Sequence, residues 1–329
     1  LNEENNHIKI KNLSLSNTNK IKNIDHVRFN YLDTENKKNE YVIKKVSKYN
    51  YLINGKSFNA NSLISNLLES SDKNENNFFE NNLNIDLNLK EVYFDEINFV
   101  KDLKGNLKIK NNKVVDLDIL AFFDNSNNLN FTIRTSDKGE KITTLFSSKA
   151  KPLVNRYKFI KGFKDDKDGY LDFYSLKKNG VSKSKLVIDN FKVKEIPSLA
   201  KLLALASLQG IADLLTGEGI RFTDFEMNFT NENEIMKIEE LYAIGPAISI
   251  LLEGYIEEDN LISLRGTLVP ATTINRSIAS IPLLGDLLIG KKIGDGVFGV
   301  SFKIKGHPKN LETTVNPIKT LTPRFITRT

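Results

Sequence analysis

The sequence of 329 residues contains no cysteine and only three histidines. The lack of cysteine excludes disulfide bonds, thiol nucleophiles and cysteine-ligated metal sites. His7, His26 and His307 are isolated, with no H-x-x-x-H pair, and no G-x-S-x-G motif is present. We therefore expect a protein that is not an enzyme and that uses no metal and no cofactor. Carboxylates are plentiful, and because a sequence cannot pair them across a fold, a glycosidase-type pair stays open.

Long hydrophobic runs are also missing. No stretch reaches the roughly 18 to 20 consecutive apolar residues of a membrane-spanning helix, and the first residues, Leu1 to Asn6, do not resemble a signal peptide. The chain opens in mid-pattern without a methionine. We therefore expect a piece of a longer protein whose upstream part carries any membrane anchor.

The charge of the chain is moderately basic, with a formal net charge of +6 and a pI near 9.1. Such a charge is compatible with nucleic acid or with anionic lipid head groups. The basic residues mostly alternate with acids, as in Lys164 to Asp168, and there is no arginine-rich helix or aromatic RNA-binding motif. Nucleic acid is therefore not an expected partner.

Apolar and polar residues alternate from residue 81 onward. A period of two is typical of half-buried strands, and the asparagine-rich and glycine-containing turns between them indicate consecutive hairpins of an antiparallel sheet. The first alternating residues are Leu83, Ile85, Leu87 and Leu89, then Leu107 and Ile109, Leu117 and Ile119, and Leu129, Phe131 and Ile133. The pattern resumes in Tyr170 to Tyr174, Lys185 to Val193, Phe222 to Phe229, Ile235 to Ala243, Ile248 to Ile256, Leu261 to Leu268 and Phe298 to Ile304.

Three segments have helical spacing instead: Ala60 to Leu68, Pro197 to Leu215 and about Thr272 to Ile289. The middle segment is apolar around most of its circumference, so it is expected to pack on the sheet as a plug or cap; a membrane-interface helix stays the alternative. The polar stretch Ser71 to Asn82 resembles a linker. We therefore expect residues 1–75 to form a strand-and-helix unit that continues an upstream β region, and residues 76–329 to form the main β domain.

Two short motifs are misleading in their context. The segment Gly294 to Gly299 matches G-x-G-x-x-G, but a helix-like segment precedes it and a strand pattern follows, the reverse of a dinucleotide site. Asp166 and Asp168 resemble the start of a calcium loop, but Lys164 and Ser175 stand where its first and last ligands belong. Neither motif predicts a site.

The last 130 or so residues contain a series of segments that together are typical of one family. In the family's order, they are Ile196 to Phe222, Ile244 to Ile248, Arg265 to Pro270, Ile281 to Leu288, Gly296 to Phe298 and Val315 to Pro317. This part of the chain resembles the C-terminal region of the AsmA-like family of bacterial envelope proteins, and most closely that of its large YhdP-type members. Upstream, Gly55 to Ala60 resembles the family more diffusely, and residues 1–40 are not covered.

This resemblance implies an elongated, curled sheet with an apolar concave face and a few short apolar helices. It also implies a place in the periplasm of a Gram-negative bacterium, with an inner-membrane anchor upstream and contact with the outer membrane or its proteins. The implied role is phospholipid transfer and upkeep of the outer-membrane barrier, with the acyl chains as partners. The groove candidates are Leu83, Ile85, Leu87, Leu89, Leu129, Phe131 and Ile133; the cap or membrane-contact candidates are Leu202, Leu205, Ile281, Leu284 and Leu288.

The physics of this role agrees with the alternating pattern. At roughly 0.8 kcal/mol per CH2, exposing two long acyl chains to water costs on the order of 20 kcal/mol, so a lipid in transit needs continuous apolar cover. One face of a curled sheet supplies such cover. A β-sandwich with its apolar faces in contact would show the same pattern and stays open. The other hypotheses are an assembly factor that binds outer-membrane proteins by strand addition, a periplasmic scaffold and, third, an enzyme.

Overall fold

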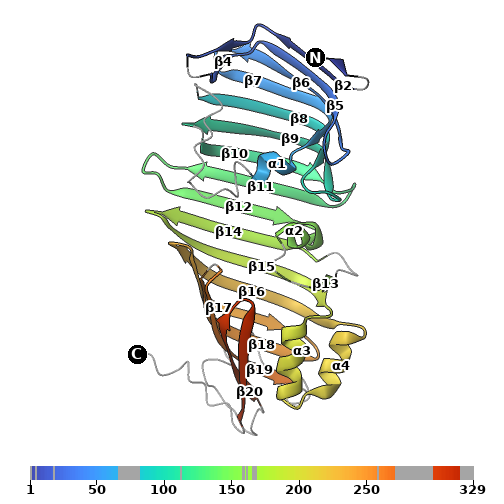
Figure 1. Ribbon diagram of the computed structural model, residues 1–329, viewed down its shortest axis with the longest axis vertical. Coiled ribbons are helices and arrows are strands. Elements are labelled where there is room, and N and C mark those ends of the chain that lie inside the picture. Colours follow the sequence, from blue (N-terminus) through green and yellow to red (C-terminus); the bar gives the residue numbers. More distant parts are fainter. Residues whose placement is uncertain are drawn as a thin grey trace. The chain divides into compact units, whose positions relative to one another are not determined.

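The computed structural model describes residues 2–3, 6–17, 19–65, 82–111, 113–157, 160, 162–164, 169–257, 259–270 and 299–318. Most of these residues lie in strands, with four short helices among them, which confirms the predicted mostly β fold (Figure 1). The chain divides into two compact units. Unit 1 comprises residues 1–152 and 172–179, and unit 2 comprises residues 153–171 and 180–329. No helix in the described ranges is both long and apolar enough to cross a bilayer.

Unit 1 is built from one large sheet in which nearly all neighbouring strands are antiparallel. Its turns use asparagine in the left-handed region, as at Asn36, Asn111 and Asn179, where the short polar side chain tolerates a positive φ. The strands of this sheet, paired in this order, are β1 (Asn2–Glu3), β2 (Asn6–Lys11), β5 (His26–Leu32), β6 (Lys38–Ser47), β7 (Asn50–Asn59), β8 (Leu83–Tyr93), β9 (Phe99–Lys110), β10 (Lys113–Phe122), β11 (Asn128–Thr135), β12 (Lys141–Ser147) and β14 (Leu171–Lys178).

One pair of strands departs from the predicted antiparallel order. Strands β7 and β8 run parallel, with Asn50 opposite Asn84 and Asn59 opposite Tyr93. A parallel pair needs a crossover connection, and here residues 60–82 provide it, including helix α1 (Asn61–Ile64). Helix α1 lies in the predicted segment Ala60 to Leu68, of which residues from 66 onward fall outside the described ranges. The predicted division at residues 75 and 76 falls within unit 1.

Unit 2 contains antiparallel strands and two of the four described helices in full. Strand β20 begins at Gly299, so the G-x-G-x-x-G segment leads into a strand, as the alternation predicted. The strands, in order of pairing, are β13 (Phe163–Lys164), β15 (Val181–Val193), β16 (Ile220–Glu232), β17 (Ile235–Ile244), β18 (Ile248–Glu257), β19 (Leu261–Pro270), β20 (Gly299–His307) and β21 (Asn310–Ile318). The helices are α3 (Pro197–Leu205) and α4 (Gln209–Thr216), while α2 (Ala150–Tyr157), which was not predicted, spans the division between the units.

The prediction of a single helix from Pro197 to Leu215 was wrong. Helix α3 ends in a Schellman motif, in which Leu208 N–H donates to the carbonyl of Leu203 at 2.9 Å, and Ser207 adopts a φ of 59°. Ser207, in the left-handed conformation, changes the direction of the chain, and the second helix, α4, begins at Gln209. The predicted helix near residues 272–289 lies outside the described residues.

A cluster of side chains centred on Asp33 holds the turn between β5 and β6. One carboxylate oxygen of Asp33 accepts backbone N–H bonds from Glu35 and Lys37, both at 2.9 Å. The other accepts the amides of Asn39 at 3.0 Å and Asn59 at 2.8 Å, and Asn39 is only 1% exposed. Burial by itself would raise the pKa of Asp33, but these donors outweigh it and hold the pKa below its usual value.

This cluster predicts a loss of stability in acid. Because the pKa of Asp33 is lower in the folded chain, its contribution is present above the unfolded pKa and is lost as pH falls through the folded pKa. We expect the urea midpoint of the parent protein to fall between about pH 5 and pH 2.5, and that of Asp33→Asn to fall less. An equal decrease of the urea midpoint in both proteins would show that Asp33 does not cause the pH dependence of stability.

Candidate functional site: a half-buried apolar row in unit 1

The register of unit 1 aligns one inward-facing residue from each of nine strands in a row that crosses the sheet at right angles to the strands. We call this the central row. At about 4.8 Å per strand, it extends for roughly 40 Å. Its members, from β2 to β12, are Ile10, Val27, Ile43, Ile53, Leu87, Gly105, Ile119, Phe131 and Leu145.

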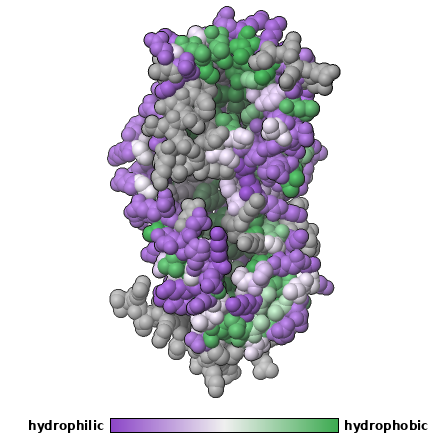
Figure 2. Space-filling model, viewed as in Figure 1, coloured by the Kyte–Doolittle hydropathy of each residue, from purple (hydrophilic) through white to green (hydrophobic). Residues whose placement is uncertain are grey.

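The central row is less buried than the rows beside it. Its members Ile43, Ile53, Leu87, Ile119, Phe131 and Leu145 are each half-buried. Towards one end of the strands, Leu83, Ile109 and Val114 are buried, and towards the other end Leu103 is buried too. Figure 2 shows apolar side chains in a hollow beside the N-terminal strands, with hydrophilic side chains around it. The row is therefore an apolar surface that is partly exposed at most of its members, with the exception of Val27, which is 1% exposed.

The structure brings the predicted groove residues together on this face. Leu83, Ile85 and Leu87 on β8 pack in one apolar cluster, and Phe131 and Ile133 on β11 belong to a second. Leu107 contacts both clusters and so connects the two strands. The two remaining candidates are Leu89, which is buried, and Leu129, which is half-buried. Only Leu87 and Phe131 of the predicted set lie in the central row.

Sequence reasoning missed the part of the row before residue 81. Ile43 and Ile53 face each other across β6 and β7, and Ile53 in turn faces Leu87. The alternation of Tyr41 with Ile43 and of Tyr51 with Ile53 was a signal that could have found them. The alignment of these residues with β8 depends on the parallel pair, which the local pattern does not predict.

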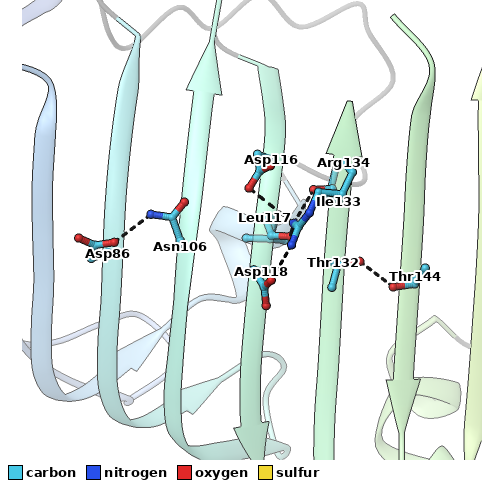
Figure 3. A network of polar contacts seen from close by, with 9 residues as sticks. All are labelled: Asp86, Asn106, Asp116, Leu117, Asp118, Thr132, Ile133, Arg134 and Thr144. Carbon is cyan, nitrogen blue, oxygen red and sulfur yellow. Dashed lines mark hydrogen bonds and ion pairs between the residues drawn. The ribbon is translucent and has the colours of Figure 1, made fainter. Parts of the chain in front are cut away.

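The opposite face of the same sheet is polar (Figure 3). Arg134 donates to Asp118 at 2.5 Å and lies 3.5 Å from Asp116, so one guanidinium joins β10 and β11. Two further pairs link neighbouring strands: Asn106 donates to Asp86 at 2.9 Å, and the hydroxyls of Thr132 and Thr144 are 2.7 Å apart. The sheet thus has one apolar and one water-facing side, as the alternation predicted.

Unit 2 has a row of the same kind in its own sheet. Met227, Leu241 and Leu252 are half-buried and aligned, and this row continues to Gly266 and Phe302. A Cβ on Gly266 would lie 2.6 Å from Cζ of the Phe302 ring, so glycine is needed where the aromatic ring covers the strand. A half-buried apolar row is therefore a property of each unit.

Two of the predicted cap residues, Leu202 and Leu205, lie in helix α3 of unit 2. Leu202 is buried and Leu205 is half exposed. Helix α3 contacts β21 and α4 contacts β16, so the helical pair packs on the sheet of unit 2 with one side. The other three cap candidates, Ile281, Leu284 and Leu288, fall in the stretch from 271 to 298 that the structure does not describe.

The strongest catalytic candidate is a carboxylate pair on the polar face of unit 2. Asp189 and Asp224 are opposite each other on β15 and β16, and burial together with the charge of Asp224 raises the pKa of Asp189. The adjacent pair Ile188 and Phe225 faces the buried side, so the two acids face away from it. In the described part of the chain, no three histidine or acidic side chains are placed to hold a metal ion.

Comparison of the chain with protein-family models, with curated proteins and with solved structures gave no match. The resemblance to the AsmA-like family therefore stays a prediction, and the functional argument depends on the geometry of the apolar rows.

Proposed function

We propose that this protein carries phospholipids between membranes without catalysis, by holding their acyl chains along the central row of unit 1. The observation that carries the proposal is a long, half-buried apolar row on one face of a sheet whose other face is polar. On this proposal the protein works in the periplasm of a Gram-negative bacterium, with its anchor in the inner membrane, and maintains the outer-membrane barrier.

The dimensions of the row suit an acyl chain. With carbon–carbon bonds of about 1.5 Å, an extended chain of about 16 carbons is roughly 20 Å long, half the length of the central row. Contact along the row would remove much of its CH2 surface from water, at roughly 0.8 kcal/mol for each buried group. Because the row has no polar side chain, a chain can also slide along it without breaking a hydrogen bond.

The same observation weighs against a closed β-sandwich and hence against a purely structural scaffold. A sandwich core would bury the middle of the apolar face against a second sheet. Within the described residues of unit 1, the second sheet consists only of β3 (Ser14–Leu15) and β4 (Ile21–Asn23). Six residues of the central row remain half-buried, so this surface is available to a ligand.

Mass spectrometry of organic extracts from the purified protein tests the proposal. We expect phospholipid in the parent and about tenfold less in Leu87→Asp with Phe131→Asp, because two carboxylates in the row would have to be desolvated by the acyl chains. The matched control is Asn88→Asp with Asn130→Asp, which adds the same charge at neighbouring exposed positions of β8 and β11. The control should retain its lipid.

Circular dichroism of all three proteins verifies that each is folded. Equal lipid in the folded row variant and the parent would contradict the assignment of the row. No phospholipid in any of the three would contradict lipid transfer and favour the assembly-factor or scaffold hypothesis, of which the first predicts binding of unfolded β-rich peptides.

A further inference from the structure

The hairpins of unit 1 form two margins along the apolar face, one at each end of the strands. The turns after β6, β9 and β11 and the end of β14 lie at one margin, and the turns after β5, β8 and β10 lie at the other. The turns alternate between the two margins because each antiparallel strand reverses the direction of the strand before it. The exception is β8, which runs in the same direction as β7.

The two margins differ in charge. The turns named for the first margin bear seven lysines and two acids, Asp137 and Glu140, and we call it the lysine margin. The second bears five acids beside three lysines, Lys37, Lys38 and Lys149. The residues of the lysine margin are Lys48, Lys110, Lys113, Lys138, Lys141, Lys177 and Lys178; the acids of the second margin are Asp33, Glu35, Asp95, Glu96 and Asp124.

The acids of the second margin have structural partners. Asp95 accepts the backbone N–H groups of Ile97 at 2.8 Å and Asn98 at 2.6 Å. Asp124 accepts the same kind of bond from Asn127 at 3.0 Å and is paired with Lys149 at 2.7 Å. These carboxylates therefore stabilise the turns, and the charge of Asp124 is balanced by Lys149.

One residue of the lysine margin, Lys141, is placed to reach over the apolar face. Lys141 has the same strand parity as Leu145 in the central row, four residues away, which is about 13 Å along the strand. A lysine side chain can lay its apolar stem along such a surface and keep its amine in water at the border. Lys178 is paired with Glu140 at 2.6 Å, so part of the charge is balanced within the margin.

We propose that the lysine margin binds the phosphate of the lipid whose acyl chains lie on the central row, so that the head groups are arranged along this margin. The inference depends on the proposed lipid transport and adds the substrate class: a diacyl lipid with a net negative head group. The opposite margin attracts the same phosphate less, because five acids lie beside its lysines. This difference in charge orients every bound lipid in one direction.

A binding assay with two fluorescent lipids of identical acyl chains tests this inference. One probe is phosphatidylglycerol and the other is diacylglycerol, which lacks the phosphate. We expect the parent protein to bind phosphatidylglycerol roughly tenfold more tightly, since each lysine near an anionic lipid contributes a severalfold gain at low salt. The preference should decrease as salt is added, because these charges are exposed to solvent.

The decisive variant is Lys48→Gln with Lys138→Gln and Lys141→Gln. It should bind both lipids equally, with the affinity for diacylglycerol unchanged. The matched control removes three charges elsewhere in unit 1, by Lys90→Gln, Lys101→Gln and Lys104→Gln on exposed positions of β8 and β9, and it should keep the preference.

Each other outcome overturns a specific claim. Failure of the parent to bind either lipid contradicts the proposed function itself. Equal binding of both lipids by the parent, or a preference that survives in the lysine variant, overturns the lysine margin while leaving the apolar row intact. Competition by glycerol phosphate as strong as by phosphatidylglycerol shows a phosphate site that is independent of acyl chains, and this too overturns the inference.

Discussion

Replacing Gly55 with alanine is expected to destabilise unit 1 by about 2 to 3 kcal/mol, the range of a core that has been overpacked. Gly55 on β7 lies opposite Tyr41 on β6, and an added Cβ would be 2.4 Å from Cβ of Tyr41 and 2.5 Å from the carbonyl oxygen of Glu40. Tyr41 has little room to move, because its ring stacks on Phe29 at 4.7 Å and contacts Phe58 edge-on at 5.0 Å.

Urea denaturation of the variant and the parent measures this effect. The control is Asn54→Ala, the adjacent exposed residue on the other face of β7, which should change the free energy of unfolding by less than about 0.5 kcal/mol. A Gly55→Ala protein as stable as the parent would show that β6 and β7 are not packed as tightly as the structure indicates.

Leu203→Ala is expected to lower the free energy of unfolding of unit 2 by about 3 kcal/mol, because it removes a fully buried side chain and leaves a cavity. Leu203 is 0% exposed, and Leu202 beside it is buried as well. In contrast, Leu205 in the same helix is 50% exposed, so Leu205→Ala should cost less than about 0.5 kcal/mol. The two variants remove the same atoms from one helix and differ only in burial.

Thermal or urea unfolding of both leucine variants distinguishes the two roles assigned to this helix from sequence. A large effect at Leu203 alone agrees with a helical pair that packs on its sheet. An equal effect at Leu205 would mean that this side chain is covered in solution. A Leu205→Ala protein of parental stability that loses binding to phospholipid vesicles would support the membrane-contact hypothesis for α3.

Local sequence patterns predicted much of the fold because each strand carries its own signal. The alternation at Leu83 to Leu89 placed β8 and its inward side chains correctly, and that at Leu129 to Ile133 did so for β11. Turn residues with a tolerance for positive φ, such as Asn111, marked the hairpins. These features depend on residues close together in the chain, which is why they can be read without a structure.

The features that the sequence did not predict depend on partners that are distant in the chain. No glycine or proline stands at the break between α3 and α4 itself, from Ala206 to Leu208, and the nearest glycine, Gly210, lies within α4. Leu203 of α3 and Leu215 of α4 are both fully buried, and this burial depends on the tertiary structure. The parallel pairing of β7 with β8 connects strands separated by residues 60–82. No local pattern encodes which way a strand will pair after such a connection.

The sequence by itself determined that the sheet has one apolar and one polar face, because side chains on a strand alternate with a period of two whatever the strand pairs with. Only the tertiary structure decided which of the apolar residues lie in one row and which remain accessible. Ile53, Leu87 and Phe131 become neighbours along that row through the hydrogen-bond register of the intervening strands. Register is a property of a pair of strands, so it is determined only when the two strands form hydrogen bonds with each other.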